Sequence, residues 1–218
     1  NERTETAAVA DVIKRLAMAH SQVGFSFAAD AGASFDYAPC EAGPEGKRRR
    51  IAQVLGDEFR ANSIEIDAAR EDITLTGFAS LPTHNRGNAQ MQFVYVNGRP
   101  IRDKLFTGAI RAAYMDFLAH DRHPSLVLYL HCDPKIVDIN VHPAKAEVRF
   151  ADPGLIRGLV VGAIKQALAR ESHRSTSANA RSAINLIAEK YAHRNTPPVN
   201  WDIHASPSAP KDFRLKIG

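Results

Sequence analysis

The segment VDINVHPAKAEVRF, residues 137–150, carries a single lysine, Lys145, in a polar loop between two strand-like ends. Pro143 restricts the backbone just before this lysine and so orders the loop. An ordered loop presents the ammonium group as a fixed point charge, which is well suited to contacting a phosphate. Exposed lysines more commonly have a purely structural role, so the pattern alone leaves both interpretations open.

His142 lies in the same loop and is a candidate general base. Catalysis of the triad type needs a serine, cysteine or carboxylate partner, and none is apparent nearby in the sequence. We therefore expect His142 to shape the loop through hydrogen bonds.

A second group of candidate residues is basic and sits where a predicted strand turns into a predicted helix. Its members are Arg99, Arg102, Lys104 and Arg111, set against one acid, Asp103. Lys104 and Arg111 are seven residues apart and share a helix face, and the other two lie in the turn before it. Such a corner suits a nucleic-acid backbone, because each ion contact with a phosphate releases counterions. A solvated charged face is the alternative.

The densest basic run is GKRRR, residues 46–50, at the start of a predicted helix, where the helix dipole disfavours positive charge. A solubility patch and an anion site are equally compatible with it. The run is no P-loop, because the G-x-x-x-x-G-K-[ST] spacing is absent, and no GxGxxG follows a strand. Cys40 and Cys132 are isolated, without the spacing of a zinc site.

Hydrophobic periodicity predicts the elements that position these residues. In the second half, one strand is predicted from residue 91 to its stop at Asn97-Gly98 and another over 125–133. Helices are predicted over 103–119 and 152–169, the latter with Asp152 as N-cap. Strands flank the lysine loop. This pattern predicts an α/β sandwich, a mostly β sheet with helices packed on one face.

The first half is predicted to begin with an amphipathic helix over 4–19, which turns Val9, Ile13 and Leu16 inward and Lys14 and Arg15 outward. Four strands are predicted over 22–29, 34–40, 63–69 and 73–81, with a helix after the basic run.

The bulk numbers are ordinary for a globular protein: 218 residues, 44% hydrophobic, with a formal net charge of +4. No apolar run approaches the ~20 residues of a membrane span, and there is no secretory signal, so we expect a cytoplasmic protein without a membrane partner. The chain lacks an initiator methionine, and we expect a fragment of something longer. Residues 172–180 read as a polar linker, and the composition from 194 onward predicts an exposed tail.

The motif YVNGRPIRD, followed about forty residues later by VDINVHPAKAEVRF, resembles the MutL family of DNA mismatch repair proteins. The two motifs have the family's order and separation, with the apolar strand SLVLYLHCDP between them. The resemblance is strongest over 91–170, and the pattern of 4–81 is compatible with it. The tail from about 195 resembles the family's variable linker.

The resemblance implies an ATPase domain of the gyrase/Hsp90/histidine-kinase (GHKL) type, followed by a transducer domain with the ribosomal protein S5 domain 2-like fold. This chain resembles the transducer, over residues 1–171, with an additional helix and the start of a flexible interdomain linker over 172–218. The implied fold is a mixed sheet with helices on one face and a left-handed βαβ crossover. The ATPase motifs would precede residue 1, so we expect no catalytic residue here and no enzymatic activity from the fragment, although the full-length protein would be an ATPase.

The resemblance also assigns roles to single residues. The family's lysine that reaches the γ-phosphate of ATP falls on Lys145, with Asn140, His142 and Pro143 supporting the loop. ATP with Mg²⁺ would be bound mainly by the missing domain, so no cofactor or metal is expected on the fragment alone. The family's DNA-binding groove falls on the basic corner, where Arg99 and Arg102 match the NGR-x-x-R pattern and Lys104 and Arg111 add charge.

The implied mechanism is a switch. ATP sensed by the transducer would favour self-association of the N-terminal halves around DNA and would couple the mismatch sensor MutS to a downstream endonuclease and helicase. Two alternatives are the transducer of a type II topoisomerase-like ATPase and a stand-alone S5-like nucleic-acid-binding module. An enzyme complete in this chain is not supported, because no nucleophile–base or metal constellation is present.

Overall fold

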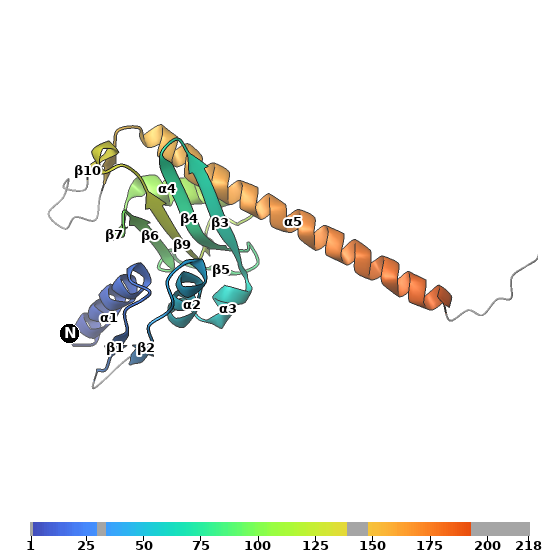
Figure 1. Cartoon of the computed structure of the whole chain (residues 1–218), viewed down its shortest axis with the longest axis horizontal. Helices are drawn as coiled ribbons and strands as arrows, with labels where there is room; N and C mark the ends of the chain where they lie inside the picture. The colour runs from blue at the N-terminus through green and yellow to red at the C-terminus, as the bar shows by residue number, and fades with distance from the viewer. Residues whose placement is uncertain (1, 30–33, 139–147, 193–218) are drawn as a thin grey trace, which may run out of the picture. The chain divides into compact units, whose positions relative to one another are not determined.

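The computed structural model describes residues 2–29, 34–138 and 148–192, with the backbone alone for residues 2–3 and 175–192 (Figure 1). The chain divides into two compact units, residues 1–174 and 175–218. The helices are α1 (Glu2–Ala19), α2 (Pro44–Leu55), α3 (Asp57–Ala61), α4 (Lys104–Tyr114), the 3₁₀ turn η1 (Pro134–Ile136) and α5 (Pro153–Ala192). The strands are β1 (Phe25–Phe27), β2 (Phe35–Tyr37), β3 (Ser63–Arg70), β4 (Ile73–Ser80), β5 (Asn85–Arg86), β6 (Gln92–Val96), β7 (Arg99–Ile101), β8 (His123–Pro124), β9 (Leu126–His131), β10 (Val137–Asp138) and β11 (Arg149–Phe150).

The core of the first unit is a five-stranded sheet in the order β3-β4-β9-β6-β7. Neighbouring strands are antiparallel except β6 and β9, which pair in parallel and are joined through β7 and α4. This is a mixed sheet with a βαβ crossover. Residues Leu126 to Leu130 of β9 are all buried, so this predicted strand is covered on both faces.

Helices pack on both faces of this sheet. Phe106 and Ile110 of α4 and Ile164 of α5 join one apolar cluster with the inward side chains of the strands. On the opposite face, Met18 of α1 and Ile51 of α2 pack with aromatic side chains of the sheet. The predicted α/β class is confirmed. Helices α4 and α5 pack together on one face of the sheet, as predicted. The cover that α1, α2 and α3 give the other face, visible in Figure 1, was not predicted.

The predicted orientation of α1 is wrong. Val9 is 48% exposed and Leu16 is 40% exposed, whereas Arg15, expected outside, is only 9% exposed. The helix instead buries Ala10, Ala17 and Met18. The guanidinium of Arg15 is buried as well and lies over the ring of Phe93, 4.7 Å from its centroid.

Arg50 explains part of the basic run, because its side chain is fully buried. Nη1 donates to the carbonyl oxygen of Ala17 at 2.9 Å, and Nη2 donates to three more, those of Ser21, Val23 and Ala38, at 2.7 to 3.1 Å. One guanidinium therefore joins the end of α1, the strand pair β1–β2 and α2. The backbone carbonyl dipoles stabilise its charge. This structural role differs from both predicted ones, a solubility patch and an anion site.

The other three bases of the run are also engaged within the fold. Lys47 lies over the ring of Tyr129 at 5.0 Å, and Arg48 lies over the ring of Phe78 at 5.4 Å. Arg49 forms an ion pair with a nearby glutamate at 3.1 Å. These contacts give the run a packing role.

Helix α5 begins as predicted, since the Asp152 carboxylate accepts a hydrogen bond from the amide of Leu155 at 2.9 Å and Pro153 opens the helix. The helix continues to Ala192, so the prediction of a polar linker over residues 172–180 is wrong, because the backbone there is helical. Polar composition alone does not end a helix when no glycine or proline interrupts it.

Candidate functional site

A two-residue turn at Asn97 and Gly98 places the basic corner. Both residues have positive φ, 48° and 81°, and join β6 to β7 with Val96 opposite Arg99. Asn-Gly favours such hairpin turns because both positions require the left-handed region. The Asn97 side chain also accepts from the amide of Cys132 at 3.0 Å and donates to its carbonyl at 3.1 Å. The turn is thereby fixed to the end of β9, and Arg99 follows at a defined, exposed position.

Asp103 joins the corner to the strand that follows the lysine loop. Its Oδ1 accepts from the amide of Leu105 at 2.7 Å and caps α4, the helix that the sequence predicts to start at this residue. Its Oδ2 accepts from the amide of Val148 at 3.2 Å. Val148 is the first described residue after the segment 139–147. The second contact spans 45 positions and leaves no local sequence signal.

The structure places all four predicted DNA-contacting side chains on the surface. Arg102 donates from Nη2 to Asp11 of α1 at 2.9 Å, and Arg111 contacts the ring of His120. The side chains of Arg99 and Lys104 form no hydrogen bond or ion pair with any other residue that the structure describes. Lys104 and Arg111 lie on the same exposed side of α4, as the seven-residue spacing predicts.

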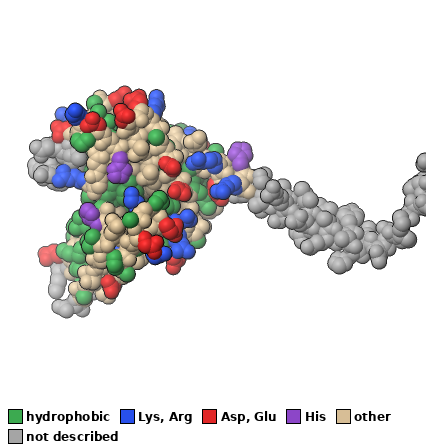
Figure 2. Space-filling model, in the orientation of Figure 1, with side chains coloured by type: hydrophobic (Ala, Val, Ile, Leu, Met, Phe, Trp, Pro, Cys, Tyr) green, Lys and Arg blue, Asp and Glu red, His purple; other side chains and the backbone are tan. Residues whose placement is uncertain are grey.

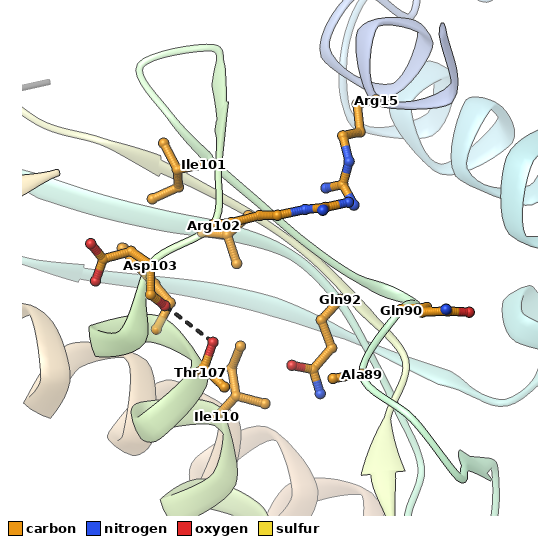
Figure 3. A pocket seen from close by; sticks show the side chains of 11 residues that line it. Arg15, Ala89, Gln90, Gln92, Ile101, Arg102, Asp103, Thr107 and Ile110 are labelled. Atoms are coloured by element: carbon orange, nitrogen blue, oxygen red, sulfur yellow. Dashed lines mark hydrogen bonds between the residues drawn. The ribbon is translucent and has the colours of Figure 1, made fainter. Parts of the chain in front are cut away.

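A pocket of about 340 Å³ adjoins this corner between α1, the segment before β6 and the start of α4 (Figure 3). Arg15 and Arg102 extend into it from α1 and from the corner before α4. Its other polar lining residues are Gln90, Gln92, Asp103 and Thr107. The sequence did not indicate Arg15 as a site residue, because a charged residue next to Lys14 is expected on the outward side of the helix.

The predicted nucleotide-contacting residues Asn140, His142, Pro143 and Lys145 lie outside the described residues. The described flanks of that segment are paired: β10 and β11 are antiparallel, with Val137 opposite Phe150. The two ends of the segment are therefore held side by side, and the predicted strands on either side are confirmed.

Metal-binding clusters and membrane-spanning helices are absent from the described residues. Within 2–29, 34–138 and 148–192, no cluster of three or more His, Cys, Asp or Glu side chains is arranged to hold a metal ion. No helix in the same ranges combines the length and apolar character needed to cross a bilayer. Cys40 and Cys132 are both free thiols.

Residues 51–169, more than half of the chain, match the family model described as DNA mismatch repair protein, C-terminal domain. The match contains both the Asn-Gly turn and the segment with the HPAK motif. The chain belongs to the MutL family of DNA mismatch repair proteins. Membership in this family removes the topoisomerase alternative.

The relatives named DNA mismatch repair protein MutL are longer than this chain. The protein of Methylocella silvestris is 52% identical over 211 residues, which cover 96% of this chain and 35% of the relative. The protein of Brucella anthropi is 54% identical over 186 residues, which cover 85% and 30%. The chain thus spans about a third of the length of the relatives it matches.

Among solved structures, the N-terminal domain of a DNA repair protein superposes with a TM-score of 0.61 at 20% identity. The superposition covers 76% of this chain and 54% of that structure. At this identity the likeness concerns the fold, and the fold is the S5-like α/β arrangement that the sequence resemblance implies.

Proposed function

We propose that this chain is the transducer region of a MutL protein. It would contribute a DNA-contacting surface at the basic corner and report the nucleotide state of an ATPase region through Lys145. The observation that carries the proposal is the position of Asp103. One carboxylate caps the helix that begins with Lys104 and also holds the amide of Val148, just after the segment that carries Lys145. A DNA-contacting element and a nucleotide-contacting element would thus be adjacent at one corner.

The DNA contacts would be made to phosphates and would not read sequence. Arg99 and Lys104 support this role because both are exposed and carry charges without a described partner. Arg102 is 66% exposed in its ion pair with Asp11, and such a surface pair contributes only about 0–1 kcal/mol, so DNA can compete for it. Arg111 extends the same side of α4. The chemistry predicts binding that weakens steeply with salt.

The ATP contact would involve a preceding part of the full-length protein, a GHKL-type ATPase region that holds most of the nucleotide and its Mg²⁺. An exposed apolar stripe on α1, formed by Val9, Val12 and Leu16, supports such a neighbour. Exposed apolar stripes on a helix are typical of surfaces that pack against another part of the assembly. Lys145 would reach the γ-phosphate from the transducer side, with Asn140, His142 and Pro143 holding its loop.

The wider role follows from the family. ATP-dependent association of two N-terminal halves would enclose DNA, and the same state would connect the mismatch sensor MutS to a downstream endonuclease and helicase. We infer that this takes place in the bacterial cytoplasm, at the nucleoid.

The nucleotide part of the proposal is tested by replacing Lys145 with alanine in the full-length protein. Loss of one charge-assisted hydrogen bond, about 1.5–3 kcal/mol, predicts an ATP affinity about 10- to 100-fold lower. Lys135→Ala is the matched control, because Lys135 is an exposed lysine in the nearby turn η1. Equal ATP affinities for the two variants would show that Lys145 does not contact the nucleotide. DNA binding should be the same for both.

A further inference from the structure

One edge of the central sheet is open. β3 ends the strand order β3-β4-β9-β6-β7, and among the described strands it pairs with β4 alone (Figure 1). It is eight residues long, more than the average strand of about 5–6 residues, whereas natural edge strands are commonly very short. An edge of this length presents a row of backbone donors and acceptors to an extended chain that approaches it.

The register with β4 shows which backbone groups of β3 face the open edge. The amide of Leu81 donates to the carbonyl oxygen of Asn62, just before β3, at 2.8 Å. Because bonded and non-bonded positions alternate along an antiparallel pair, the even-numbered residues of β3 bond to β4 and the odd-numbered ones face outward. Glu65, Asp67 and Ala69 belong to the outward set and are exposed. No hydrogen bond joins their backbone groups to another residue that the structure describes.

A groove of about 780 Å³ lies along this edge, between β3 and the stretch of α5 from Ala167 to Arg174. Ile64, Leu81 and Ala167 form its apolar part. Figure 2 shows basic side chains on α5 next to the part of the helix drawn in grey, and Arg170 and Arg174 of this stretch line the groove. An extended chain placed here would lie beside β3 and would also contact a helix.

The side chains of Glu65 and Asp67 lack a charged partner. Both point to the face of the sheet opposite α5, since the side chains that alternate with them join the apolar cluster with α5. Neither forms a hydrogen bond or an ion pair with another described residue, and their cross-strand neighbours in β4 carry no charge. Lys47 and Arg48 of α2 lie over aromatic rings and pair with neither acid. Bases on an added strand, directly opposite the two acids, would form cross-strand ion pairs.

A second copy of β3 does not fit this edge. Antiparallel pairing of two copies about a twofold axis, in any register that pairs most of the strand, sets Glu65 or Asp67 opposite itself or sets the two opposite each other. Like charges at directly opposite positions are destabilising. The charges therefore favour a different extended segment.

We propose that β3 accepts an extended segment of a partner protein as a sixth strand of the sheet, with basic side chains opposite Glu65 and Asp67. The alternate side chains of that segment are apolar, because they point to the α5 side and meet the apolar part of the groove. The proposal is independent of the proposed DNA and ATP contacts, because neither the basic corner nor the segment 139–147 takes part.

A synthetic peptide of alternating lysine and valine residues is the probe, added to the 218-residue chain and followed by NMR-detected hydrogen exchange. At a peptide concentration about tenfold above the dissociation constant, exchange of the outward amides of Glu65 and Asp67 should slow about tenfold. The amides of Ile64 and Ile66 already bond to β4 and should change little. Absence of this alternating protection would contradict the proposal. Protection that grows with protein concentration without peptide would also contradict it, because a second copy would then occupy the edge.

N-methylation of the peptide tests the backbone contacts without altering the protein. Only one alternate set of the peptide's N–H groups faces β3. Methylation of that set should abolish binding, and methylation of the other set should leave it. Equal effects of the two sets would show that the peptide does not pair as a strand.

Glu65→Lys with Asp67→Lys tests the choice of a basic partner. Both side chains are exposed, so the fold should be kept. The lysine peptide should bind this variant at least about fivefold more weakly, and a peptide with glutamate in place of lysine should bind it more tightly than the wild type. Asp36→Lys with Asp121→Lys is the matched control, an equal change of charge at exposed positions outside the groove. Equal losses in the two variants would indicate general charge attraction and would overturn the proposal.

Discussion

At the scale of single residues, side chains with two or more contacts carry the organisation of this protein. Arg50 holds four carbonyl groups from three segments, and Asn97 fixes a turn to the end of β9. Asp103 has the same character and is the one that bears on function, because its two oxygens serve different elements. Replacing such residues should affect both the stability and the mutual placement of the elements they join.

Asp103→Asn separates the two contacts of this carboxylate. The amide oxygen can still cap α4, but the amide nitrogen cannot accept from Val148, which leaves that N–H unpaired. We expect the free energy of unfolding to fall by about 1–3 kcal/mol, measured by urea denaturation. Asp152→Asn is the control, since that carboxylate caps its helix through the amide of Leu155 and should lose less than about 1 kcal/mol. Equal losses would show that the Val148 contact contributes nothing.

At the scale of elements, one glycine decides how closely two central strands approach. Gly77 of β4 lies opposite Leu128 of β9 and has a φ of 142°. A Cβ built at this position would lie 2.0 Å from the carbonyl oxygen of Val127. The nearest atoms are backbone atoms of Val127 and Leu128 in the middle of the sheet. They cannot move aside without disturbing the hydrogen bonds between β4 and β9.

Gly77→Ala should therefore lower the free energy of unfolding by about 1–3 kcal/mol, seen as a lower urea midpoint. Gly162→Ala supplies the control, because Gly162 lies in α5 with nothing within 4 Å of the place that an added methyl group would take. That change should raise stability by about 0.5–1 kcal/mol through helix propensity. A neutral Gly77→Ala would mean that the two strands are not held this close.

Local sequence signals predicted the elements that have strong periodicity or a cap. Such signals predicted the strands β3, β4, β6 and β9, the start of α4 next to Asp103 and the start of α5 at Pro153. The orientation of α1 did not, because Arg15 is buried by a contact with Phe93 far along the chain. Tertiary contacts of that kind override the amphipathic pattern of a single helix. For the same reason the sequence did not predict the pocket at Arg15.

The same distinction applies to the candidate site. The exposed positions of Arg99 and Lys104 followed from the turn and the helix face, which are local. The partner of Arg102 on α1 and the contact of Asp103 with Val148 join positions far apart in sequence, 91 and 45 residues, and have no local signature. Lys145 remains a prediction from family resemblance.

At the scale of the whole molecule, three buried tyrosines link the layers. The hydroxyls of Tyr95 and Tyr129 donate to carbonyls of α1, and that of Tyr114 donates to Ser80 at the end of β4, at 2.6 to 2.9 Å. Burial raises the pKa of all three well above the ordinary value of 10.0. The folded protein therefore keeps three protons that the unfolded chain releases near pH 10.

This difference predicts steep alkaline destabilisation. Below pH 10 both states hold the protons, so the contribution to stability is fully present. Above pH 10 the unfolded chain loses them first, and each tyrosine lowers the free energy of unfolding by about 1.4 kcal/mol per pH unit. Urea midpoints measured from pH 8 to 11 should be level up to about pH 10 and fall beyond it. Tyr95→Phe should reduce the slope, and an unchanged slope would contradict the raised pKa.

The most direct test of the proposed function is duplex DNA binding by the 218-residue chain across a series of salt concentrations. Charge reversal at the corner, Arg99→Glu with Lys104→Glu, is compared with an equal reversal on the opposite side of the sheet, Arg49→Glu with Arg60→Glu. Both control residues are exposed, on α2 and α3.

We expect wild-type affinity to fall steeply with salt and the corner variant to bind at least about tenfold more weakly, with a slope reduced by about two units. The control variant should bind much as the wild type does. Binding that is absent in the wild type, or that both variants reduce equally, would contradict a DNA-contacting surface at this corner.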